Sequence, residues 1–108
     1  MNKEKIIKES KTYTKIIDKQ IYLKSKYFSI YYEKTNNNNK YGITIPKKIG
    51  KANIRNKIKR QLKNIIITNE KTIQSGYNYV IIIKKPILKL KYQDMKEELL
   101  ELIKKVRD

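Results

Sequence analysis

The chain of 108 residues has no cysteine, no histidine and no tryptophan. Without Cys or His it can form neither a disulfide framework nor a thiolate or imidazole zinc site, and it offers no Cys or His nucleophile. The lack of cysteine is consistent with the reducing cytoplasm. We therefore expect function to rest on charge, hydrogen bonding and aromatic surface.

Long hydrophobic runs are also missing. The longest apolar runs, 65–67 and 80–83, fall far short of the roughly 20 residues that a membrane helix needs. The first residues lead into no sustained hydrophobic region, so a secretory signal is not expected. The sequence predicts a soluble cytoplasmic protein with no membrane partner, which forms one domain over residues 1–108.

Acidic residues are scarce. Ten Asp and Glu stand against 27 Lys and Arg, which gives a formal net charge of +17. A composition rich in Lys, Ile and Asn is expected from AT-rich codons, but such codons also encode Glu and Asp, so the scarcity of acids is the more informative feature. It favours a polyanionic partner, because each phosphate that is neutralised releases a condensed counterion. Nucleic acid is the first candidate, and an acidic membrane surface or an acidic protein is the alternative.

The charges are unevenly distributed along the chain. No acidic residue occurs between Glu33 and Glu70, whereas ten Lys and Arg residues do. The C-terminal segment instead mixes Glu98 and Glu101 with Lys105, as is typical of a solvated helix face. The functional surface is therefore predicted in the middle third.

Periodicity predicts the secondary structure. Helices are expected over about 6–17, 53–67 and 92–106, and strands over 27–32, 41–45 and 77–84, with a short extra strand near 21–23. Asn53 is the expected cap of the second helix, and the four asparagines 36–39 are expected to form a mobile hairpin loop. The fold class is α+β, a single-domain α-β sandwich with the order α-β-β-(β)-α-β-α, the bracketed strand being the short one.

The predicted helix 53–67 has two unlike faces. Apolar residues recur at spacings of four, four and three: Ile54, Ile58, Leu62 and Ile65. The opposite face carries cations and an amide but no carboxylate: Arg55, Asn56, Lys59, Arg60 and Lys63. Like charges four residues apart destabilise a helix, so this face is expected to bind an external anion.

Arginine is rare, which makes its placement informative. Two of the three arginines in the chain, Arg55 and Arg60, lie on this face. Arginine grips phosphate with a planar five-donor fork, whereas lysine acts as a point charge. Their presence in a lysine-dominated chain indicates that binding geometry matters here.

The segment 55–63 reads Arg-Asn-Lys-Ile-Lys-Arg-Gln-Leu-Lys and resembles the RNR signature, Arg-Asn-x-x-Lys-Arg-x-x-Arg, of bacterial ribonuclease P protein subunits. Two more blocks, 42–52 and 79–86, resemble the strand and Lys-Lys turn before the signature and the buried strand after it. Lys63 keeps the charge where the signature ends in Arg, and Ile17 stands where a Phe is common.

The resemblance implies a noncatalytic subunit of a ribonucleoprotein endonuclease that removes the 5′ leader from precursor tRNA. The catalytic RNA carries the reaction with bound Mg²⁺, the protein binds no cofactor of its own, and one protein pairs with one RNA. The residues implied to contact that RNA are Arg55, Asn56, Lys59, Arg60, Lys63, Lys47 and Lys48. The residues implied to line an aromatic leader-binding cleft are Tyr13, Ile17, Phe28 and Tyr31. The family fold also implies a left-handed βαβ crossover, against the general preference.

Two questions stay open at this level. A ribosomal or general RNA-binding protein without a processing role would share the basic helix, and only a preference for leader-bearing tRNA separates the two. Strand alternation directs one of Tyr31 and Tyr32 outward and the other inward, but it does not say which.

Overall fold

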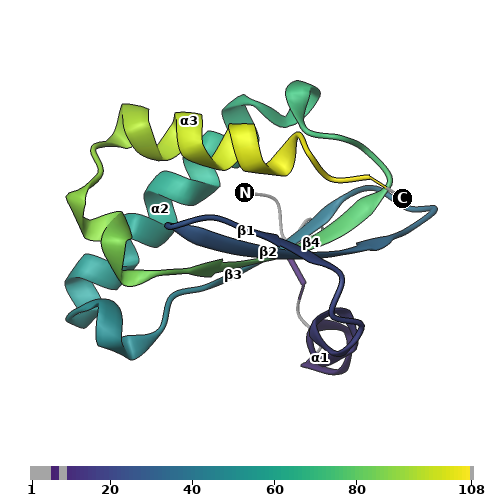
Figure 1. The fold of residues 1–108 in the computed structure, drawn as a ribbon, viewed down its shortest axis with the longest axis horizontal. Helices are drawn as coiled ribbons and strands as arrows, with labels where there is room; N and C mark the ends of the chain where they lie inside the picture. The colour runs from purple at the N-terminus through teal and green to yellow at the C-terminus, as the bar shows by residue number, and fades with distance from the viewer. Residues whose placement is uncertain (1–5, 8–9, 108) are drawn as a thin grey trace.

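The computed structural model of the protein describes residues 6–7 and 10–107. The elements, in chain order (Figure 1), are α1 (Ser10–Asp18), β1 (Tyr22–Lys24), β2 (Phe28–Lys34), β3 (Lys40–Thr44), the 3₁₀ turn η2 (Lys47–Ile49), α2 (Ala52–Thr68), η3 (Glu70–Thr72), β4 (Tyr77–Ile83), η4 (Lys85–Lys89) and α3 (Tyr92–Ile103). The predicted α+β class is confirmed, and the short extra strand is β1.

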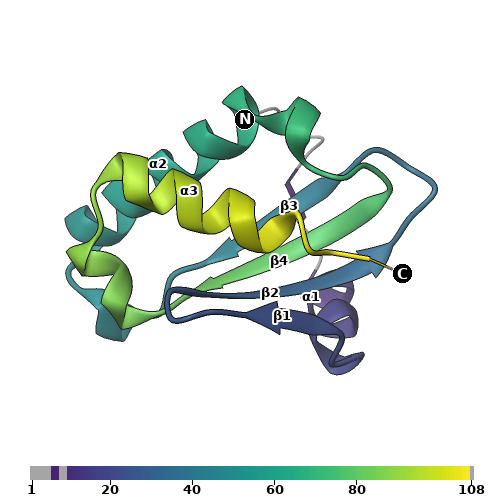
Figure 2. The same cartoon turned by 45° about the horizontal axis from the view of Figure 1, so that its top comes forward.

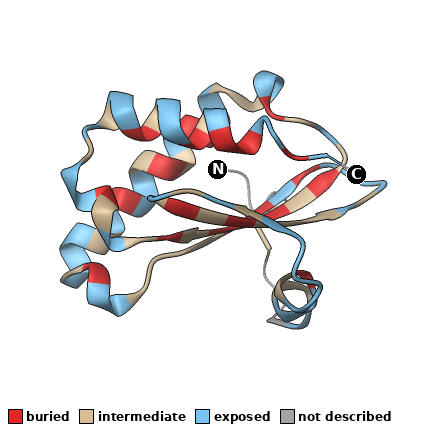
Figure 3. Cartoon of the chain, viewed as in Figure 1, coloured by how far each residue is buried: buried red, intermediate tan, exposed pale blue. Residues whose placement is uncertain are grey.

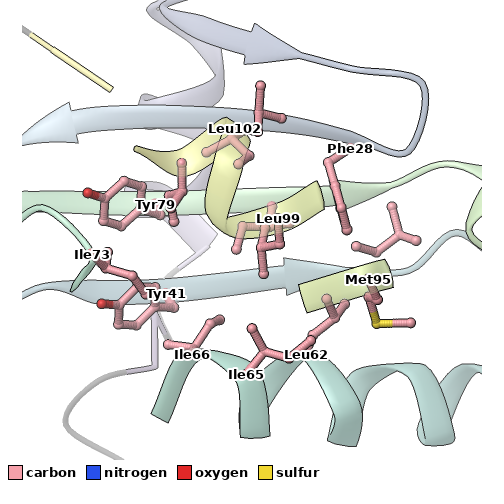
Figure 4. Close-up of a cluster of buried hydrophobic side chains, with 14 of the residues drawn as sticks. Phe28, Tyr41, Leu62, Ile65, Ile66, Ile73, Tyr79, Met95, Leu99 and Leu102 are labelled. Carbon is pink, nitrogen blue, oxygen red and sulfur yellow. The ribbon is translucent and has the colours of Figure 1, made fainter. Parts of the chain in front are cut away.

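The sheet forms the middle layer of the molecule. Helices α2 and α3 cover one face of the sheet, and α1 lies alone on the other (Figure 1). The core fills the space between the sheet and the α2–α3 pair (Figures 3 and 4). The side chains of Met95, Leu99, Leu102 and Ile103, from the predicted stripe of α3, are buried in it.

The strand order is β1-β2-β4-β3, and the hairpin predicted between β2 and β3 is wrong. Strand β4 lies between them, antiparallel to β2 and parallel to β3. Its sequence, Tyr-Asn-Tyr-Val-Ile-Ile-Ile, is apolar on both sides of the pleat. Burial on both faces therefore stabilises this strand most at the centre of the sheet.

The parallel strands β3 and β4 are joined through α2. When the molecule is viewed with α2 in front of the sheet, the chain crosses from β3 to β4 in the left-handed sense (Figure 2). The crossover handedness that the family resemblance implies is thus confirmed, although most βαβ units are right-handed. This arrangement brings α2 beside the edge strand β3.

Alternation along β2 decides which tyrosine faces which layer. Phe28, Ile30 and Tyr32 point towards α2 and α3, where they belong to the core or pack against it. Successive strand residues point to opposite faces, so Tyr31 points to the α1 side. Tyr32 therefore packs against the core, and Tyr31 is half-buried on the other face of the sheet.

The first apolar pair does not join the N-terminal helix as predicted. Helix α1 begins at Ser10, whereas Ile6 forms a parallel β-bridge with Tyr41. The backbone N–H of Ile7 donates to the Tyr41 carbonyl oxygen at 3.1 Å. The free edge of β3 thus offers backbone groups that this segment satisfies.

Two details of α2 also differ from the predictions. Ile54, predicted in the buried stripe, is 39% exposed because it lies at the end of α2 that extends past the sheet. Asn53 is not the cap: the helix begins at Ala52, after Lys51, and no side chain caps it. The rest of the stripe is confirmed, with Ile58, Leu62 and Ile65 buried and Ile66 added to it.

The asparagine run is not a uniformly mobile loop, because Asn39 is buried. Its amide nitrogen donates to the Gln74 carbonyl oxygen at 2.8 Å, and its amide oxygen accepts from the Tyr77 backbone N–H at 3.0 Å. Asn39 thereby ties the start of β3 to the segment that leads into β4. A buried amide with satisfied donors and acceptors favours one conformation.

Tyr79 adds a further hydrogen bond to this region and leads to our first prediction. Its hydroxyl donates to the Gln74 carbonyl oxygen at 2.7 Å, and its ring stacks on Tyr41. Burial, with smaller contributions from Tyr41 and Tyr77, raises the pKa of Tyr79 well above its ordinary value. Tyr79→Phe should lower the free energy of unfolding at pH 7 by about 1 kcal/mol, because one hydrogen bond is lost.

The pH dependence gives a sharper test of the same variant. Above about pH 10 the unfolded tyrosine ionises while the folded one keeps its proton, so the wild-type free energy of unfolding falls. Phenylalanine has no such proton. The difference in the free energy of unfolding between wild type and Tyr79→Phe should therefore shrink as pH rises above about 10. Urea unfolding at pH 7 and about pH 11 measures it, and a constant difference would contradict the buried, protonated phenol.

Candidate nucleic-acid interface

The cationic residues of α2 form one continuous solvent-accessible face. Asn56, Lys59 and Arg60 are exposed, and Arg55 and Lys63 are half-buried. They share this face because residues four apart along a helix lie above one another. Among residues 6–7 and 10–107 none of these side chains takes part in an ion pair, so the charge of the face is available to an external anion.

Arg55 is held in place by the turn that precedes the helix. Its Nε donates to the Gly50 carbonyl oxygen at 3.1 Å, which orients the guanidinium fork. Lys47 and Lys48 belong to the same turn, and Lys51 flanks the first helical residue. Cations at a helix N-terminus interact unfavourably with the helix dipole. A bound anion would therefore stabilise this end of α2.

The cationic face of α2 and this helix end together predict that simple anions stabilise the protein. At a phosphate concentration about tenfold above its dissociation constant, the free energy of unfolding should rise by about 1.4 kcal/mol. The melting temperature should then rise by about 5–10 °C for a domain of this size. Thermal melts in millimolar phosphate, compared with chloride at equal ionic strength, measure the effect.

The control for that experiment is a protein with a weaker cationic face. Lys59→Gln/Arg60→Gln should melt at a temperature that responds less to phosphate, because two of the charges that bind it are gone. A wild-type melting temperature that is the same in phosphate and chloride would contradict anion binding at this face.

Tyr13 lies where α1 meets the edge strand β3. A Cβ atom at Gly42 would lie 2.7 Å from Cε2 of Tyr13, so glycine is needed for the ring to rest directly on the strand. A hollow of about 160 Å³ opens there between Tyr13, β3 and the α2 residues Lys59 and Lys63. The cationic face of α2 therefore continues to the α1 side of the sheet.

The Tyr13 hydroxyl is the polar atom of this junction. Among the described residues it is buried without a hydrogen-bond partner, and burial raises the pKa of Tyr13 above its ordinary value. The phenol therefore stays neutral at physiological pH, and its ring is held by packing against Gly42.

Tyr31 belongs to the same face, two strands away. The register aligns Tyr22, Tyr31, Val80 and Gly42 across the four strands. Neighbouring strands lie about 4.8 Å apart, so Tyr31 on β2 and Tyr13 over β3 are separated by about 10 Å. The Tyr31 ring packs against Tyr22, with centroids 4.9 Å apart and planes inclined by 31°.

Tyr22 is an aromatic residue of this face that the sequence does not single out. It lies on the edge strand β1 and is exposed, so Tyr22 and Tyr31 together present a two-ring surface. The predicted short strand near 21–23 is the only sequence signal for it, because strand pairing, not spacing, places the two rings together.

The structure separates the four residues expected in the aromatic cleft. Tyr13, Ile17 and Tyr31 belong to α1 or to the α1 face of the sheet, and Ile17 is half-buried one helical turn after Tyr13. The structure places Phe28 outside such a cleft: it is 0% exposed and belongs to the core between the sheet and the α2–α3 pair (Figure 4). Along β2, Phe28 points to the same face of the sheet as Ile30 and Tyr32, and all three belong to the core or pack against it.

The described part of the chain contains neither a metal-binding cluster nor a membrane-spanning helix. No group of three or more Asp, Glu, His or Cys side chains is arranged there to hold a metal ion. None of the helices in that part of the chain has both the length and the apolarity that a bilayer crossing requires.

Comparison with known proteins places the chain in a family. The family model described as Ribonuclease P matches residues 1–107. The ribonuclease P protein component of Mycoplasma mycoides subsp. mycoides is 36% identical over 109 residues, which cover 99% of this chain and 100% of the relative. That of Streptococcus agalactiae is 31% identical over 105 residues, with 96% and 95% covered.

Solved structures show the same architecture. The ribonuclease P protein from Thermotoga maritima superposes with a TM-score of 0.88 at 26% identity, over 94% of this chain and 97% of that one. The ribonuclease P protein from Staphylococcus aureus gives a TM-score of 0.82 at 24% identity, with 93% of each chain covered, and this second likeness shows the fold.

Proposed function

Because this chain belongs to the family of ribonuclease P protein components, which act in tRNA processing, we propose that it is the noncatalytic subunit of a ribonuclease P ribonucleoprotein that removes the 5′ leader from precursor tRNA. The observation that carries the proposal is the carboxylate-free cationic face of α2, which continues to an aromatic face on the α1 side of the sheet.

The cationic face suits a folded RNA. Arg55 and Arg60 provide bidentate donors for phosphate, and the flanking lysines neutralise further phosphates. Lys47 and Lys48 extend the same charge beyond the N-terminal end of the helix. We assign this surface to the catalytic RNA, with one protein bound to one RNA.

The aromatic face suits a single strand. Unpaired bases stack on tyrosine rings beside cationic side chains, and each stacked base contributes about 1–3 kcal/mol. Tyr31 with Tyr22 offers one stacking surface, and Tyr13 lies beside Lys59 and Lys63 at the other end. We assign this face to the 5′ leader, with Ile17 as an apolar neighbour and without Phe28.

The protein's part in the reaction is binding and orientation. Magnesium ions held with the RNA supply the chemistry of phosphodiester cleavage when they are bound. The side chains of this chain neutralise backbone phosphates and hold the leader in line with the RNA, which lowers the entropic cost of bringing the substrate to the cleavage site.

Reconstitution tests the proposal directly. The protein should increase cleavage of precursor tRNA by its cognate RNA at low magnesium, where phosphate repulsion is least screened. Cleavage that does not change when the protein is added would contradict it.

Substrate preference distinguishes the proposed subunit from a general RNA-binding protein. The proposed subunit should give a holoenzyme that binds precursor tRNA more tightly than mature tRNA, since only the precursor has a leader. Equal affinity for the two would favour an RNA-binding role without processing.

A further inference from the structure

Helix α1 carries a row of lysines beside the proposed leader face. Lys11, Lys15 and Lys19 are spaced by four residues, so they lie along one side of the helix and its C-terminal end. Together with Thr14 and Asp18 they line a shallow hollow of about 560 Å³ on the surface of α1. These three lysines would attract the backbone of a single-stranded RNA, as the cationic face of α2 does.

Two of these lysines are already paired with a carboxylate. Lys19 Nζ donates to Glu33 Oε1 at 2.7 Å, and Lys15 Nζ lies 3.5 Å from the same oxygen. Glu33 is the one acidic residue in the four strands. Its side chain is 10% exposed, against 66% for Lys15 and 43% for Lys19, so the carboxylate is fixed while the ammonium groups can move into solvent.

The carboxylate is charged when RNA arrives. Burial alone would raise the pKa of Glu33, but the hydrogen bond and charge of Lys19, with the charge of Lys15, lower it below its ordinary value. Glu33 points to the same face as Tyr31, two residues earlier on β2, which is about 7 Å along the strand. That distance is within the Debye length of about 8 Å at physiological salt, so the charge of Glu33 offsets part of the attraction that Lys15 and Lys19 exert on a phosphate beside the Tyr31 ring.

We propose that Glu33 is a specificity-determining residue that confines the leader: it holds Lys15 and Lys19 away from RNA phosphates and so favours cationic contacts with the leader on the Lys59 and Lys63 side. This inference rests on the proposed function, because it names the residue that shapes the leader site. A leader that crosses the Tyr22–Tyr31 surface is then attracted more strongly toward Lys59 and Lys63 than toward Lys15 and Lys19.

The test is the substitution Glu33→Gln in the reconstituted holoenzyme, with binding measured without turnover. Leader-bearing precursor tRNA should bind about two- to fivefold more tightly, as expected when exposed charge pairs are released. The plot of log affinity against log salt should steepen by about 0.7 for each lysine that reaches a phosphate of the single strand. Affinity for mature tRNA, which has no leader, should not change.

Two further variants distinguish release of the lysines from a general change in charge. Glu98→Gln makes the same change in net charge on an exposed residue of α3, across the sheet from Glu33, and should leave leader affinity at the wild-type value. Glu33→Gln/Lys15→Gln/Lys19→Gln removes the lysines as well, and should return the salt dependence to the wild-type slope.

The outcomes separate the inference from the function on which it rests. If Glu33 only clamps α1 to the sheet, Glu33→Gln and the triple variant will both weaken precursor binding, which overturns the inference. Unchanged affinity and slope for Glu33→Gln also overturn it. If the wild-type holoenzyme itself fails to distinguish precursor from mature tRNA, the proposed function fails instead.

Discussion

Replacing Arg60 with alanine should weaken association of the protein with its catalytic RNA about 10- to 100-fold, because hydrogen bonds to a charged partner contribute about 1.5–3 kcal/mol. Arg60 is exposed and has no ion-pair partner among the described residues, so the change removes no ion pair from the described part of the fold. The slope of log affinity against log salt should fall by about 0.9 if the contacted phosphate is in duplex RNA, by analogy with duplex DNA. Titration of labelled RNA at several salt concentrations measures both quantities.

Two substitutions sharpen that experiment. Arg60→Lys keeps the charge but not the planar fork, so it should preserve the salt slope while losing part of the affinity. Arg107→Ala removes the third arginine, which is exposed near the C-terminus, and should have little effect on either quantity. If Arg60→Ala left the slope at the wild-type value, Arg60 would not contact phosphate.

Replacing Tyr31 with alanine should weaken binding of precursor tRNA to the assembled holoenzyme about 5- to 150-fold, the loss expected for one stacked base. Assembly with the catalytic RNA should not change, since Tyr31 lies on the α1 side of the sheet and α2 on the other. The remaining Tyr22 ring would lose its neighbour at 4.9 Å and the two-ring surface with it. Binding of precursor and mature tRNA, compared in parallel, isolates the leader contribution.

The matched control is Tyr31→Phe, which keeps the ring and removes only the hydroxyl. It should bind precursor tRNA within about threefold of wild type, because stacking depends on the π-face. A melting temperature for Tyr31→Ala shows whether the fold is retained. Equal losses for precursor and mature tRNA would show that Tyr31 does not act through the leader.

The two surfaces meet at one place, and the fold explains why. The crossover from β3 to β4 brings α2 beside the β3 edge, and Gly42 lets Tyr13 rest on that same edge. Lys59 and Lys63 therefore belong to the cationic face of α2 and to the hollow beside Tyr13. In the proposed function, these two lysines are where bound catalytic RNA and bound leader come closest.

The sequence by itself determined the features that depend on local spacing and composition. The cationic face of α2 follows from helical periodicity over 55–63, because side chains three and four apart must share a side of any α-helix. The buried strand 77–83 follows from its continuous apolar run. The RNR block is also enough to indicate the family, which the comparisons confirm.

Only the tertiary structure decided which faces and strands meet. The alternation in β2 is readable from the sequence, but whether Phe28 or Tyr31 faces the core depends on where α2 and α3 pack. Three features of the structure join residues 14 or more positions apart in the sequence. They are the position of β4 between β2 and β3, the burial of Asn39, and the pairing of Glu33 with Lys15 and Lys19. Such contacts depend on the relative stability of whole arrangements of strands, since a pleat has two equivalent faces until a second layer buries one of them.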